Sequence, residues 1–186
     1  MLPFTGQLKV IQKCDEEQFK INKYVYDVYL VEAGNLELKA LFDIRYPVKE
    51  GDYIYSEDLY LTNFSKSRTA DFLMVRVGWF DIIEECDYVK KDYFEIKCNG
   101  RIIKSSTSEL RKIGARQKEF YACTISIKNE FGKPFNVLLV SFYRKAKSLY
   151  ALENDSFANI TAKLCLKRFS DGHELVLTGY DIVGVK

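Results

Sequence analysis

Residues 94–183 decide the fold of this chain, because they hold five strand-like segments in a fixed order. These segments are FEIKCNGRIIK (94–104), EFYACTISIK (119–128), FNVLLVSFY (135–143), ANITAKLCLKRF (158–169) and ELVLTGYDIV (174–183). The turn NEFGKP joins the second strand to the third, and SDGH joins the fourth to the fifth. A helical segment, RKAKSLYALEND (144–155), separates the third strand from the fourth. The stretch is therefore predicted to form three strands, one helix and two more strands.

This order of elements is that of the OB-fold, a partly open five-stranded Greek-key barrel. OB-folds bind oligonucleotides across the face of their second and third strands and through their connecting loops. The chain contains 13 Tyr and 13 Phe, which favours an all-β structure, since aromatic side chains suit pleated, half-buried surfaces. Its function can therefore be predicted from where charges and rings fall on this frame.

The first half of the chain repeats the pattern of the second. Its strand-like segments are GQLKVIQK (6–13), YVYDVYLVEA (24–33), NLELKALFDIRY (35–46), GDYIYSEDLYLTNF (51–64) and TADFLMVRVGWFDIIEE (69–85). Phe80-Asp81-Ile82-Ile83 falls 100 residues before Tyr180-Asp181-Ile182-Val183. This predicts a tandem OB-fold, with a reduced barrel in residues 1–88 and a complete barrel in 89–186. The first half has only the short segment PVKEG at the position of the helix in the second half. The alternative to two barrels is a single larger β-sandwich.

Short motifs in the second half occur in an order known from one family. Asn99-Gly100-Arg101-Ile102 ends the first strand, and Phe120 and Ala122 open the second. Arg144-Lys145-Ala146 starts the helix, and TGYDIV (178–183) closes the last strand. In this order they resemble the bacterial and phage single-stranded DNA-binding protein family. The resemblance implies non-catalytic binding of single-stranded DNA in replication, recombination or repair, in the cytoplasm of a bacterial or phage-infected cell.

The two halves differ in charge. Up to residue 90 there are 11 Lys/Arg against 16 Asp/Glu, a net charge of −5, whereas from residue 91 there are 17 against 10, a net charge of +7. The halves therefore present different surfaces to a polyanion. We expect the basic half to bind DNA, and the acidic residues 1–88 to serve self-association or contact with a replication-protein partner.

The strongest functional signal is the segment Lys104–Lys118, which is expected to be a basic, Ser-rich loop at the edge of the binding groove. Cations in such a loop neutralise phosphates and release counterions. Phe131, at the tip of the turn between the second and third strands, is expected to stack on bases. The candidate nucleic-acid-binding residues are Lys97, Arg101, Lys104, Arg111, Lys112, Arg116, Lys118, Lys128, Phe131, Lys133, Arg168 and Phe169.

Other polar and aromatic residues receive less functional weight. Tyr121 shares a face with apolar residues of its strand and is predicted at the edge of the core, and Trp79, mid-strand, is predicted in the core. Arg144, Lys145 and Lys147 are read as a solvated helix face. A weaker nucleic-acid contact in the first half would use Lys20, Lys23, Tyr24, Lys66, Ser67 and Arg68.

Enzymes, metal proteins and membrane proteins are disfavoured. A single histidine, His173, leaves no catalytic Ser-His-Asp or Cys-His set, no phosphate-binding glycine motif is present, and no cofactor is expected. Five cysteines without a C-x-x-C pair predict neither a disulfide framework nor a zinc site. The apolar runs are too short to span a membrane, so an intracellular, soluble chain is expected. Two alternatives stay open: an assembly module built on OB-folds, and binding of single-stranded RNA.

Overall fold

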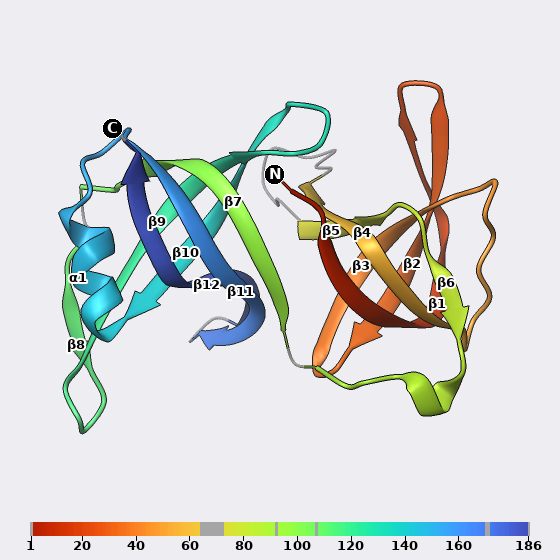
Figure 1. Ribbon diagram of the computed structural model, residues 1–186, viewed down its shortest axis with the longest axis horizontal. Helices are drawn as coiled ribbons and strands as arrows, with labels where there is room; N and C mark the ends of the chain where they lie inside the picture. Colours follow the sequence, from red (N-terminus) through yellow and green to blue (C-terminus); the bar gives the residue numbers. More distant parts are fainter. Residues whose placement is uncertain (1, 64–72, 92, 107, 170–171, 186) are drawn as a thin grey trace. The chain divides into compact units, whose positions relative to one another are not determined.

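The structure is a computed structural model that describes residues 2–63, 73–91, 93–106, 108–169 and 172–185. Within these ranges, only the backbone is described for residues 15–17, 63, 73, 166–169 and 172–175. The chain forms two compact units, Pro3–Phe94 and Glu95–Lys186. Figure 1 shows that each unit is built of strongly curved strands wound into a barrel.

The first unit is a barrel of five strands. They are β1 (Phe4–Ile21), β2 (Tyr24–Ala33), β3 (Leu36–Asp43), β4 (Tyr53–Asn63) and β5 (Leu73–Val77). The sheet runs β1-β2-β3-β5-β4, and pairing of β4 with β1 closes it. Strands β3 and β5 pair in parallel and the other neighbours in antiparallel fashion. A short strand, β6 (Asp81–Ile83), extends the sheet beside β4 and leads into the 3-10 turn η1 (Glu85–Asp87).

The second unit has the same topology. Its strands are β7 (Phe94–Ile103), β8 (Arg111–Ile113), β9 (Lys118–Lys128), β10 (Pro134–Phe142), β11 (Phe157–Phe169) and β12 (Gly172–Val185). The barrel runs β7-β9-β10-β12-β11 and back to β7, and β8 adds to the edge of β9. Among the described residues, α1 (Tyr143–Ala151), between β10 and β11, is the only α-helix. The predicted tandem OB-fold is confirmed, helix included, and the single sandwich is wrong.

Alternation of apolar and polar residues builds the interior of each barrel. In β7 every second residue from Phe94 to Ile102 is buried, and the residues between them are exposed. The chain passes closest to its neighbours at Gly100, where an added Cβ would lie 2.5 Å from Ile125 Cγ1 and 2.7 Å from Ile127 Cγ2. Gly6 of β1 is equally crowded, by Phe94 and Leu59. Gly6 and Gly100 are therefore sites of tight packing in the barrel interiors.

Gly100→Ala is expected to lower the free energy of unfolding of the second unit by about 1–3 kcal/mol, because the added methyl group overpacks the barrel interior. Chemical denaturation measures the change. Lys97→Ala, at an exposed position of the same strand, is the control and should stay within about 0.5 kcal/mol of the parent. Equal stability of the two variants would contradict the packing argument.

Two segments of the first unit differ from expectation. Strand β1 is far longer than GQLKVIQK, because a bulge carries it on: residues 14–17 lie between the pairs Lys13–Tyr29 and Gln18–Asp27, opposite Val28 alone. Residues 15–17 thus belong to a strand. The expected closing strand 69–85 is interrupted after Val77, and Trp79, predicted in the core, is 76% exposed. Residues 64–72 lie outside the described part of this segment.

Residues 87–89, where a boundary after residue 88 was expected, pack on the first unit. Gln7 Nε2 donates to the Asp87 carbonyl at 3.2 Å, and the Gln7 amide oxygen accepts the Val89 N–H. Tyr88 stacks near Tyr53, with ring centroids 5.1 Å apart, and its hydroxyl donates to the Glu32 carbonyl. The first unit accordingly extends beyond the expected boundary and ends at Phe94.

Candidate nucleic-acid interface

Strands β9 and β10 present one outer face, which is the second–third strand face of the OB-fold. Tyr121, Cys123, Ile125 and Ile127 of β9 are buried, so Tyr121 lies in the core rather than at its edge. Their alternates, from Phe120 to Lys128, point outward and are half-buried or exposed. In β10, Phe135, Val137 and Leu139 turn inward.

Two phenyl rings stand at one end of this outer face. Phe120 and Phe142 are direct cross-strand partners, and their ring centroids lie 5.4 Å apart at an interplanar angle of 50°. Both side chains are half-buried. Arg111 of β8 is the partner of Phe120 on its other side, and paired residues share a face. The half-buried ring pair therefore shares the outer face with Arg111.

The segment Lys104–Lys118, expected to be an irregular loop, contains a hairpin. Arg111–Ile113 pairs with Lys118–Phe120, and Gly114 and Gln117 take positive φ values of 69° and 51° in the turn. Since successive side chains of a strand point to opposite faces, Arg111 lies on the side of Phe120 and Lys112 on the side of Glu119. The side chains of Arg111 and Lys112 therefore lie on opposite faces of the hairpin.

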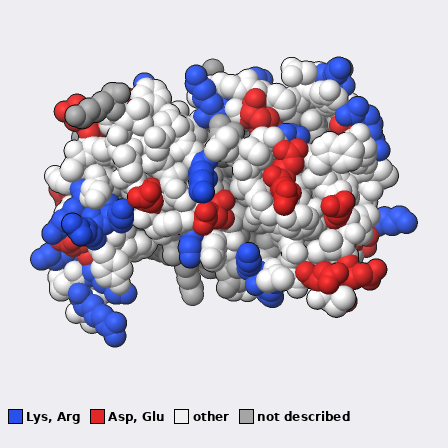
Figure 2. All heavy atoms as spheres, in the orientation of Figure 1, with Lys and Arg blue, Asp and Glu red and all other residues white. Residues whose placement is uncertain are grey.

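Lys112 belongs to a basic depression between this hairpin and α1, with a volume of about 360 Å³. Its lining residues are Lys112, Arg116, Gln117, Lys118, Glu119, Tyr143, Arg144 and Lys147. Five of them are cations and one is an acid. The Lys118 ammonium lies 5.3 Å from the centre of the Tyr143 ring, and Lys147 pairs with Glu119 at 2.9 Å. Figure 2 shows Lys and Arg gathered over this part of the second unit.

Sequence reasoning missed Tyr143, Arg144 and Lys147. Arg144 and Lys147 are solvent-exposed, as predicted for this helix face, and they also line the depression. Their spacing of three residues, which puts both on one helix face, was the available signal. Tyr143 begins α1 directly after Phe142 with a φ of 55°, and its side chain is 55% exposed. Tyr143 and Glu119, which line the depression, are thus the chain neighbours of Phe142 and Phe120.

Three other predicted cations have separate surroundings. Lys104 Nζ donates to the Tyr150 carbonyl at 2.6 Å, in the last turn of α1, where a cation suits the helix dipole. Arg101 is the outward neighbour of Ser126 and pairs with Asp155 at 3.6 Å. Lys97 lies further along β7, where it lines a cavity with residues of β11 and β12. Lys104 thus has a structural role, while Arg101 stays on the candidate face.

The β9–β10 turn carries the predicted residues Lys128, Phe131 and Lys133. The side-chain oxygen of buried Asn129 accepts the N–H groups of Phe131 and Lys133, both at 3.0 Å, which fixes the turn. Phe131 is half-buried and Lys133 exposed. Lys118 and Lys128 end β9 on opposite sides of the barrel, roughly 33 Å apart along the strand. The predicted cations therefore form two groups, and Figure 1 shows both hairpins leaving the barrel.

The remaining predicted contacts are described in part. Arg168 and Phe169 end β11, opposite His173 and Gly172, and their side chains lie outside the described part of the structure. The first-half candidates Lys66, Ser67 and Arg68 also lie outside the described residues.

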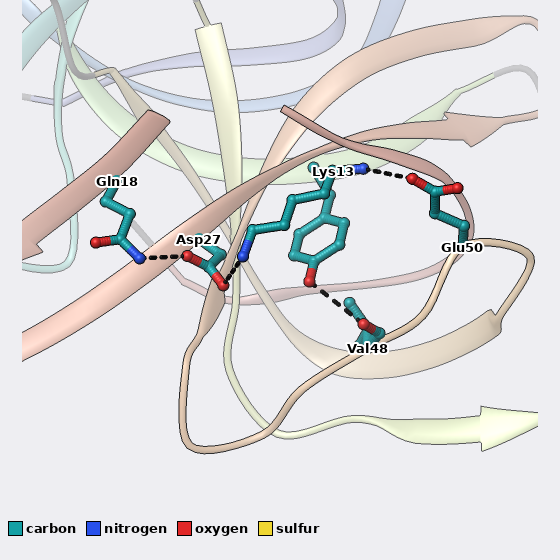
Figure 3. A network of polar contacts seen from close by, with 6 residues as sticks. Lys13, Gln18, Asp27, Val48 and Glu50 are labelled. Carbon is teal, nitrogen blue, oxygen red and sulfur yellow. Dashed lines mark hydrogen bonds and ion pairs between the residues drawn. The ribbon is translucent and has the colours of Figure 1, made fainter. Parts of the chain in front are cut away.

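In the first unit, Lys20 and Tyr24 lie in the β1–β2 hairpin rather than in a loop. Polar contacts hold the base of this hairpin (Figure 3). Asp27 accepts from Lys13 Nζ at 2.6 Å and from Gln18 Nε2 at 2.7 Å, and the Lys13 N–H donates to Glu50. Tyr29, partner of Lys13 across the strands, donates its hydroxyl to the Val48 carbonyl. Asp27 thus links the two sides of the bulge, while Val48 and Glu50 tie the hairpin to the barrel at Tyr29 and Lys13.

Chemically reactive groups are few in the described part of the chain. All five cysteines are free, and burial raises the pKa of Cys98 to about 11 and that of Cys123 to about 12, which keeps both thiols protonated. The described residues contain no cluster of three His, Cys, Asp or Glu that could hold a metal ion. None of the helices described is long and apolar enough to cross a membrane.

Comparisons with known proteins agree with this architecture. No family model matches the chain, and no curated protein matches it. Among solved structures, the wild-type single-stranded DNA binding protein from Thermus aquaticus matches 100% of this chain and 93% of its own, with a TM-score of 0.65 and 10% sequence identity. A deletion mutant of that protein matches with the same score and identity, over 95% of its chain. The predicted resemblance to single-stranded DNA-binding proteins is confirmed for the fold.

Proposed function

We propose that this protein binds single-stranded DNA without catalysing a reaction and largely without regard to sequence. The observation that carries the proposal is the ring pair Phe120–Phe142 on the outer β9–β10 face, with Arg111 on the same face. The chain neighbours of the two rings, Glu119 and Tyr143, line the basic depression. Exposed rings stack on the faces of bases, and every base offers such a face. Cations beside the rings neutralise the phosphates of the same strand.

The arrangement favours a single strand over a duplex, because the bases of a duplex are already stacked on one another. Arg101 adds a cation to the outer face, and the turn with Lys128, Phe131 and Lys133 continues the same contact at the far end of β9. The setting that fits such binding is replication, recombination or repair, in which single strands are exposed. A similar fold in a single-stranded DNA binding protein supports the proposal.

Fluorescence anisotropy with labelled oligo-dT, oligo-U and duplex DNA over a salt series tests this function. We expect tight binding of oligo-dT, weaker binding of the duplex, and an affinity that falls steeply as salt rises. Equal binding of oligo-U would move the assignment to single strands of either kind, since stacking does not by itself reject a 2′-hydroxyl. No binding at low salt would refute the proposal and favour an assembly module.

A further inference from the structure

Trp79, the only tryptophan of the chain, stands outside the first barrel on a rigid backbone. Its ring is 76% exposed, while the next residue, Phe80, turns inward and meets Phe42 edge to face at 5.6 Å. Ser56 Oγ donates to the Trp79 carbonyl at 2.6 Å, and the Trp79 N–H donates to Asp58 at 3.3 Å. These bonds hold the kink between β5 and β6, so the exposure of the ring is a fixed feature of the fold.

Trp79 is the end member of a row of flat groups that we call the aromatic row: Tyr24, Arg45, Tyr46 and Trp79. The rings of Tyr46 and Trp79 lie 5.7 Å apart, and the Arg45 guanidinium lies 5.6 Å from the Tyr46 ring and 4.8 Å from the Tyr24 ring. Arg45 donates two hydrogen bonds to the Asp43 carboxylate, from Nε at 2.9 Å and from Nη2 at 2.6 Å. Hydrogen bonds from Arg45 hold the pKa of Asp43 below its ordinary value, so the pair stays ionised at neutral pH.

The row is exposed although a folded chain gains by burying such rings. Tyr46 is 46% exposed, and the Arg45 side chain is more than half exposed. Bases of a single strand stack on aromatic rings and on guanidinium planes alike. Asp43 forms an ion pair with Arg45 and neutralises its charge. Asp58 accepts the Trp79 N–H, and Asp81 follows Trp79 by two residues in the sequence. This surface therefore suits the uncharged face of a base better than a phosphate.

We propose that the aromatic row is a second single-stranded DNA contact, in which the acidic first unit holds bases by stacking and contributes little phosphate neutralisation. This inference rests on the proposed function. It gives the first unit a role in binding that its net charge of −5 does not indicate, and it assigns the two units different parts of the interaction energy: stacking in the first, and stacking with charge neutralisation in the second.

The single tryptophan makes the test specific, because its emission reports on this row alone. The full chain is titrated with oligo-dT while the anisotropy of the labelled oligonucleotide is followed in parallel. We expect Trp79 emission to be quenched in step with binding, and to the same final extent at low and at moderate salt when the protein is saturated. Trp79→Ala should weaken binding about 5- to 150-fold, the loss of one stacked base, with an unchanged salt slope.

Two variants control for the fold. Trp79→Phe keeps a ring and should recover most of the affinity, whereas Ile82→Ala removes an exposed apolar side chain of the neighbouring strand and should bind like the parent. Saturation of the anisotropy with unquenched Trp79 emission would overturn the second contact and leave the proposed function intact. No anisotropy change at all would overturn both. Emission that depends on protein concentration without DNA would assign the row to contact between copies of the chain instead.

Discussion

Replacing Phe120 and Phe142 together with leucine is expected to weaken binding of oligo-dT by about 2–6 kcal/mol, the stacking energy of two bases at ~1–3 kcal/mol each. Leucine keeps an apolar side chain at both positions but has no flat face. Because no charge is removed, the slope of log affinity against log salt should stay that of the parent. Anisotropy titrations at several salt concentrations measure both quantities.

The matched control is the double change of the same residues to tyrosine, which keeps both rings and should bind within a few-fold of the parent. Thermal unfolding of each variant separates weak binding from a damaged fold, since the two rings are half-buried. If the leucine variant is folded and binds like the parent, the outer β9–β10 face is not the site where bases stack.

Neutralising Lys112, Arg116 and Arg144 together is expected to reduce the salt slope by about 2.1, because each phosphate contact on a single strand contributes ~0.7. If this electrostatic term vanishes near 1 M salt, the same slope corresponds to about 100-fold weaker binding at 0.1 M. The three cations line one depression, so the change should weaken binding to all sequences alike. Oligonucleotides of different sequence measured over a salt series provide the check.

The control removes the same number of charges from exposed positions of the first unit, as Lys49→Ala, Lys90→Ala and Lys91→Ala. It should leave the salt slope nearly unchanged if local contacts, rather than net charge, determine the slope. An equal loss of slope in both triple variants would show that the depression has no special role.

Arg111→Ala removes the cation that pairs with Phe120 across the strands, on the other side of the hairpin from Lys112. This change alone should reduce the salt slope by about 0.7.

Much of the fold was predictable because alternation with period two records which face of a strand is buried. In β9 the alternation placed Tyr121 among apolar residues, and the structure buries it completely. The helix after Phe142, and its absence after the third strand of the first half, also followed from composition. The alternation failed to predict the exposure of Trp79, because apolar residues continue through the kink after Val77. Hydrogen bonds between Trp79 and the β4 residues Ser56 and Asp58 hold this kink.

The sequence by itself determined two β-rich halves, their common strand order, their opposite charges and the cations of the second. The tertiary structure alone decided which side chains meet. Strand pairing separates Arg111 from Lys112, brings helix residue Arg144 beside Lys112, and joins Tyr24, Arg45, Tyr46 and Trp79 in one row. The physical reason is that burial patterns depend on neighbours along a strand, whereas a binding surface depends on register and closure between segments distant in the chain.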